Sequence, residues 1–91
     1  MKFEKLKPGM LLYSPGVFLD WIVIKHKSPD NVIADWYCQE PYGMGPPAPA
    51  FAKGYNREFG KRHWRQLKTS RLATIKDAQN LIVALFIKGN N

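Results

Sequence analysis

The feature that most constrains the fold is a pair of apolar stretches joined by a short turn. Val17 to Lys27 has apolar side chains at both odd and even positions, which is typical of a strand buried on both faces. Val32 to Gln39 follows with β-branched and aromatic residues, which favour strands. Between them, Ser28-Pro29-Asp30-Asn31 has proline at the second position of a type I turn. The two stretches therefore predict a β-hairpin.

Two further patterns flank this hairpin. Residues 6–13 contain a Pro8-Gly9 turn followed by an apolar stretch, which predicts a first strand. Near the other end, Thr74 fits the N-cap position, Asp77 follows three residues later, and the apolar spacing predicts a helix over residues 74–88. Apolar residues nearly encircle this helix, so it must be deeply buried or pair with another chain, as in a homodimer through the C-terminal helix.

Ninety-one residues make a single domain. We divide it into residues 1–39, with the first strand and the hairpin, a Pro/Gly-rich loop over 40–54, a basic and aromatic segment over 55–72, and the helix over 74–88. The four prolines between Pro41 and Pro49 forbid a regular strand ladder. A loop of this kind is either a connector, a binding loop or a ligand for a proline-reading groove.

Positive charge is concentrated in one stretch of the chain. Residues 53–71 contain seven Lys and Arg and one Glu, so they carry +6 of the total formal charge of +7. Residues 1–52 balance at zero, with five Lys and five acidic residues. A neutral body with one basic segment is typical of a protein that binds a polyanion, and nucleic acid is the leading candidate.

Aromatic residues are interleaved with these cations. Arginine and lysine neutralise phosphates, while exposed aromatic rings stack on unpaired bases. The predicted nucleic-acid-binding residues are therefore Lys53, Tyr55, Arg57, Lys61, Arg62, Trp64, Arg65, Lys68 and Arg71. Arginines also suit carboxylates, so an acidic protein surface is the alternative partner. The stretch fits a helix with its cations on one side, or a strand over Arg62 to Lys68, and we favour the strand.

Catalysis has little support in the sequence. His26 and His63 lie far apart, in no metal-ligand or catalytic-triad spacing. We expect a non-enzymatic protein without cofactor or metal. Cys38 is the only cysteine, which fits a reducing cytoplasm. The apolar run at Leu81 to Ile87 is far shorter than the roughly 20 residues that span a bilayer, so we expect a cytoplasmic protein without a membrane partner.

The opening residues 2–13, KFEKLKPGMLLY, resemble the start of many short phage and prophage proteins and of small SH3-like barrels of the KOW/Tudor kind. In those proteins a Leu-Lys-Pro-Gly-type turn leads into the first strand. The resemblance implies a five-stranded barrel and host-directed roles. The expected fold class is α+β, a small bent antiparallel sheet or SH3-like barrel with one C-terminal helix. The expected function is nucleic-acid binding, and the alternative is a protein-interaction module or phage-encoded inhibitor that binds an acidic host surface.

Overall fold

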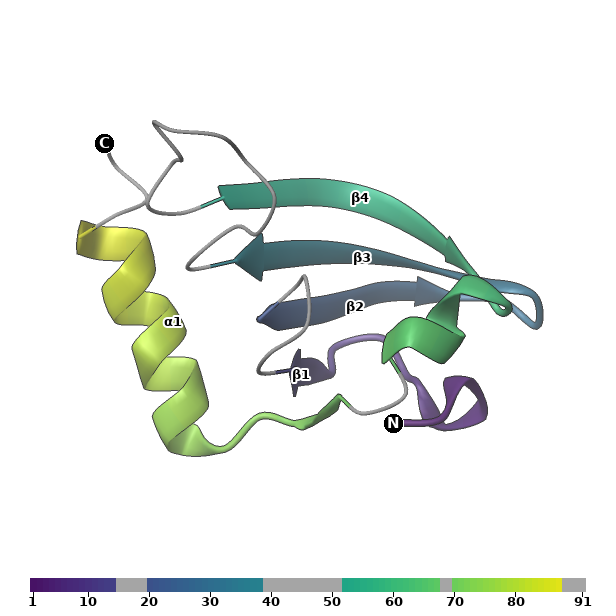
Figure 1. Cartoon of the computed structure of the whole chain (residues 1–91), viewed down its shortest axis with the longest axis horizontal. Helices are drawn as coiled ribbons and strands as arrows, with labels where there is room; N and C mark the ends of the chain where they lie inside the picture. The colour runs from purple at the N-terminus through teal and green to yellow at the C-terminus, as the bar shows by residue number, and fades with distance from the viewer. Residues whose placement is uncertain (15–19, 39–51, 68–69, 88–91) are drawn as a thin grey trace.

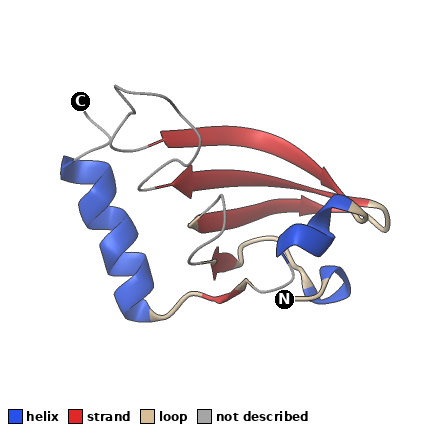
Figure 2. Ribbon diagram, viewed as in Figure 1, coloured by secondary structure: helices blue, strands red, loops and turns tan. Residues whose placement is uncertain are grey.

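Five antiparallel strands form an open, curved sheet in the order β4-β3-β2-β1-β5 (Figure 1). The structure is a computed structural model that describes residues 1–14, 20–38, 52–67 and 70–87. Two short 3-10 helices and one α-helix accompany the sheet (Figure 2). In chain order the elements are η1 (Phe3–Lys5), β1 (Leu11–Tyr13), β2 (Trp21–Lys27), β3 (Asn31–Cys38), β4 (Ala52–Gly60), η2 (His63–Leu67), β5 (Arg71–Leu72) and α1 (Ile75–Ile87).

The predicted fold class is confirmed as α+β, a small antiparallel sheet with one C-terminal helix. Of the two predicted forms of the sheet, the described strands adopt the open one, with β4 and β5 as its edges. The implied five strands are present, but they do not close into a barrel because β4 and β5 lie at opposite ends of the order.

The predicted hairpin is β2 and β3, which pair antiparallel from Trp21 opposite Tyr37 to Lys27 opposite Val32. Its connection is held by Ser28, whose backbone N donates to the Asn31 carbonyl at 2.9 Å. The Ser28 hydroxyl in turn accepts a hydrogen bond from the Asn31 backbone N at 3.1 Å. Short-range side-chain bonds of this kind explain why the sequence alone located the turn.

The predicted Pro8-Gly9 turn precedes β1. Gly9 has a φ of +91°, which a residue with a side chain rarely adopts and which type II turns require after proline. The Met10 backbone N donates to the Lys7 carbonyl at 3.2 Å and closes the turn. The strand that follows, β1, lies within the predicted residues 6–13, and residues 15–19 lie outside the described part of the chain.

The main core lies on one face of the sheet, under η1 and η2. Residues on this face pair across the strands, as Leu12 does with Ile22 and Ile24 with Ala34. Among the described residues, the cluster consists of Phe3, Leu6, Leu12, Ile22, Ile24, Val32, Ala34, Phe59, Trp64 and Leu67. Figure 1 shows η1 and η2 close together at one end of the sheet and α1 across the other end.

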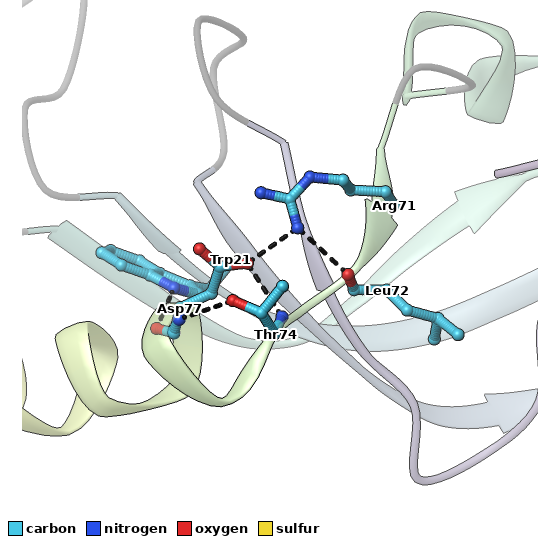
Figure 3. A network of polar contacts seen from close by, with 5 residues as sticks. All are labelled: Trp21, Arg71, Leu72, Thr74 and Asp77. Atoms are coloured by element: carbon cyan, nitrogen blue, oxygen red, sulfur yellow. Dashed lines mark hydrogen bonds and ion pairs between the residues drawn. The ribbon is translucent and has the colours of Figure 1, made fainter.

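Helix α1 meets the sheet through Trp21. This residue neighbours Ile22 in β2 and therefore points to the face opposite the main core. Its indole Nε1 donates to the Asp77 carbonyl in the first turn of α1 at 3.0 Å (Figure 3). Trp21 is 2% exposed, and Leu81 and Ala84 are buried apolar residues of α1. The predicted helix is thus present, with Thr74 just before its first residue.

The prediction of a strand over Arg62 to Lys68 is wrong. Strand β4 ends at Gly60, and residues 63–67 form the 3-10 helix η2 instead. Phe59, Trp64 and Leu67 are all buried in the main core, and their spacing does not fit the period of two that a strand requires. The predicted loop also ends earlier, because Ala52 to Gly54 belong to β4. Residues 39–51, 68–69 and 88–91 lie outside the described part of the chain.

Candidate nucleic-acid interface

Cations and one exposed aromatic ring gather along β4, an outer strand of the sheet. We call Lys53, Tyr55, Arg57, Lys61 and Arg62 the basic edge. The first three belong to β4, and the last two follow Gly60 in the turn that leads to η2. The side chains of all five are exposed. Among residues 52–62 the only acid is Glu58, whose Oε1 accepts a hydrogen bond from Asn31 Nδ2 at 2.6 Å.

A β-bulge distributes these cations over both faces of the sheet. The register between β3 and β4 shifts between Ala34 and Trp36, and Asn56 has a φ of +55°. Lys53 pairs with Tyr37 and Arg57 with Ala34. In a regular strand Lys53 and Arg57 would share a face, but the extra residue of the bulge places them on opposite ones.

Asp35 holds this bulge in place. The Asn56 backbone N donates to Asp35 Oδ1 at 2.9 Å, and Lys25 Nζ donates to Asn56 Oδ1 at 2.8 Å. Lys25 also forms an ion pair with Asp35 at 3.8 Å. Cations and a bulge are two devices by which natural sheets prevent another strand from adding to an edge. The basic edge is thus better suited to a charged ligand than to strand addition.

Tyr55 is the accessible ring of the basic edge, with 56% of its surface exposed. It contacts Tyr37 edge-on at 6.3 Å between ring centroids, and Lys53 Nζ lies 6.0 Å from the Tyr55 centroid. Burial raises the pKa of the Tyr37 hydroxyl, with smaller contributions from Tyr55 and Asp35. A half-exposed ring beside an ammonium group is suited to stacking on an unpaired base.

Trp64 is not available for the stacking role that the sequence predicted. It is 1% exposed, its indole Nε1 donates to the Met1 carbonyl at 2.8 Å, and its ring packs edge-on against Phe59 at 5.9 Å. Its indole is therefore part of the core.

Arg71 lies apart from the basic edge, because β5 is the opposite edge of the sheet. Its Nη1 pairs with Asp77 Oδ2 at 2.8 Å (Figure 3), and its guanidinium lies 5.2 Å from the Tyr13 ring centroid. Arg71 therefore links β5 to the first turn of α1 through this ion pair. Of the other predicted residues, Lys68 and the side chain of Arg65 lie outside what the structure describes.

A groove of about 720 Å³ lies at the end of β4, where the basic edge meets η1 and the turn between β2 and β3. Its lining residues are Lys2, Phe3, Glu4, Asp30, Gly60, Lys61, Arg62, His63 and Trp64. Sequence reasoning missed this groove, because it joins three segments that are far apart in the chain. Only the last of the three has a compositional signal, the cluster of cations.

Among the residues described, no three or more His, Cys, Asp or Glu side chains are grouped as a metal ion would require. None of the described helices has the length and apolar character needed to cross a membrane. The exposed large apolar residues include four on α1, namely Ile75, Ile82, Val83 and Phe86.

Comparison of the chain with protein-family models, curated proteins and solved structures finds no match to any of the three.

Proposed function

We propose that this protein binds nucleic acid along the basic edge, with a preference for single strands. The observation that carries the proposal is the alignment of four cations and the exposed Tyr55 along one outer strand and the turn after it. In this proposal Lys53, Arg57 and Arg62 contact phosphates, while Lys61, which pairs with Glu4 at 3.3 Å, contributes less. Tyr55 stacks on an unpaired base, which a duplex does not offer.

The dimensions of β4 agree with this proposal. Nine residues at about 3.3 Å each span roughly 30 Å, enough for a short stretch of extended single strand. The Arg57 side chain is partly ordered before a ligand binds, since its guanidinium lies 4.9 Å from the Phe59 ring centroid. A side chain held in this way loses less conformational entropy when it binds a phosphate.

A protein-interaction module is the second candidate function. It is favoured by the apolar side chains that α1 exposes, among them Ile75 at 81%, Ile82 at 53% and Val83 at 53%. In that account the cations of the basic edge contact acidic groups on the surface of another protein, such as a host protein. Nucleic acid would then bind weakly or not at all.

The test is fluorescence anisotropy with labelled single- and double-stranded DNA and RNA of equal length, repeated over a salt series. We expect tighter binding of single strands and an affinity that falls as salt rises. Lys53→Ala and Arg57→Ala should each lower the log–log salt slope by about 0.7, the value for one phosphate contact on a single strand. Tyr55→Ala should weaken single-strand binding by about 1–3 kcal/mol, the range for one base–aromatic stack.

Lys76→Ala is the matched control, because it removes one exposed lysine from α1 without touching the basic edge. It should leave the slope and the single-strand affinity close to those of the wild type. Absence of binding at low salt would overturn the proposal and leave the protein-interaction module. Equal losses in Lys76→Ala and Arg57→Ala would show that net charge alone attracts the nucleic acid.

A further inference from the structure

The groove at the end of β4 combines an apolar floor with a charged rim. Phe3 and Trp64 lie at its base, with 6% and 1% of their surfaces exposed. Gly60 lines the groove with backbone atoms alone, since it has no side chain that would occupy the groove. A volume of about 720 Å³ is within the range of small-molecule sites, about 300–1,000 Å³.

Part of the rim is already neutralised within the protein. Lys61 Nζ pairs with Glu4 Oε1 at 3.3 Å, and the Lys61 backbone N donates to the Asp30 carbonyl at 2.9 Å. The pKa of the Glu4 carboxyl is lowered by a hydrogen bond to its own backbone and then by Lys61. Glu4 is therefore charged near neutral pH and offsets the charge of Lys61.

Other groups on the rim remain available to a ligand. Within the described part of the chain, the side chains of Lys2, Arg62 and His63 make no hydrogen bond or ion pair, and all three are exposed. Lys2 and Arg62 are cations that can hold a phosphate. The exposed Asp30 carboxylate on the same rim is an acceptor for N–H groups.

We propose that this groove binds one nucleotide of the strand held by the basic edge. The proposal rests on the proposed function and extends it, because β4 leads through Gly60 directly into the groove. An apolar floor suits a planar base, Asp30 suits the exocyclic amine of that base, and Lys2 and Arg62 suit its phosphate. Inorganic phosphate would use the cations but make no contact with the apolar floor.

The test is an NMR titration of the ¹⁵N-labelled protein with adenosine monophosphate, adenosine and inorganic phosphate as separate probes. We expect the monophosphate to shift the amides of residues 2–4 and 60–64 most strongly, since it alone places a base on the floor and a phosphate on the cations of the rim. Arg62→Ala should weaken this binding roughly tenfold, the loss expected for one charge-assisted hydrogen bond. Lys76→Ala, on α1 away from the groove, should leave it unchanged.

Titration with a single-stranded oligonucleotide separates this inference from the proposed function. Suppose that the oligonucleotide binds through Lys53 and Arg57, but that neither the oligonucleotide nor any of the three probes shifts the groove amides. The groove inference is then overturned and the proposed function stands. If the monophosphate binds in the groove while the oligonucleotide does not bind, the proposed function fails and the groove is a site for free nucleotides. If phosphate binds as tightly as the monophosphate, the groove recognises an anion alone and the inference is overturned.

Discussion

At the residue scale, Gly54 lies where the indole of Trp36 packs over the backbone of β4. The two residues are cross-strand partners, and a Cβ added to Gly54 would lie 2.5 Å from Trp36 Cε2. Real Cβ atoms do not approach a ring so closely. The indole therefore covers the backbone of β4 just before the bulge, and glycine is required at this position for steric reasons.

We expect Gly54→Ala to destabilise the protein by about 1–3 kcal/mol, the usual cost of overpacking. Gly60→Ala is the matched control in the same strand, since its Cβ would meet His63 Nδ1 at an ordinary 3.5 Å. It should be neutral or slightly stabilising, because alanine loses less backbone entropy on folding than glycine. Urea unfolding followed by tryptophan fluorescence measures both variants. Equal stabilities for the two would contradict the steric role of Trp36.

The contrast between Tyr55 and Trp64 shows how far the sequence predicts the site. Both rings lie among cations in the sequence, yet Tyr55 is 56% exposed and Trp64 is 1% exposed. What separates them is packing against distant segments, such as the hydrogen bond from Trp64 to the carbonyl of Met1. Local composition predicts which residue types are present, but which ring is exposed depends on contacts between segments far apart in the chain.

At the element scale, α1 begins with a reciprocal capping box. The Thr74 backbone N donates to Asp77 Oδ2 at 2.8 Å, and the Asp77 backbone N donates to the Thr74 hydroxyl at 3.1 Å. The sequence predicted this cap because both partners lie within four residues. It did not predict η2, because that element depends on how Trp64 and Leu67 reach the main core. Local signals in the sequence therefore predict the start of α1 and the hairpin better than they predict the structure of the basic segment.

We expect Thr74→Ala to lower the free energy of unfolding by about 1 kcal/mol, the typical cost of losing an N-cap side chain. Among the α1 residues whose burial is described, only Asp77, Leu81 and Ala84 are buried. The loss should therefore appear first as fraying of the first turn. Amide hydrogen exchange at residues 76–78 measures this fraying. Thr74→Ser, which retains the hydroxyl, is the control and should exchange at close to the wild-type rate. Unchanged exchange in Thr74→Ala would contradict the capping role.

The same cap predicts a pH dependence of stability. The backbone N–H of Thr74, followed by the Arg71 guanidinium, lowers the pKa of the Asp77 carboxyl in the folded state. The folded pKa is therefore below the unfolded value of about 3.9. The contribution of Asp77 is fully present above the unfolded pKa and is lost as pH falls through the folded pKa.

Urea unfolding at a series of pH values from neutral to about 2.5 measures this effect. Relative to the wild type, Asp77→Asn should lose less stability on acidification, because it has no carboxylate to protonate at this site. Asp30→Asn, an exposed position outside the cap, is the control and should follow the wild-type profile more closely. Parallel profiles for the wild type and Asp77→Asn would contradict the linkage.

At the scale of the whole molecule, the sheet separates two buried regions of unequal size. The main core under η1 and η2 contains ten of the described residues, while the region on the opposite face is built around Trp21, Leu81 and Ala84. Cys38 is the last residue of β3, pairs with Ala52 of β4 and is 1% exposed. As the only cysteine of the chain, it reports through its thiol whether the β3–β4 pair has opened.

We expect the Cys38 thiol of the native protein to react with a disulfide reagent at least about 100-fold more slowly than in urea, because a buried thiol reacts only after opening. A saturating single-stranded oligonucleotide then distinguishes two kinds of opening. If Cys38 is exposed by global unfolding, bound ligand should slow the reaction by the factor 1 + [L]/Kd. If only the end of β3 separates from β4, the rate should not change. A native rate equal to the rate in urea would contradict the burial of Cys38 and the closed β3–β4 pair on which the basic edge depends.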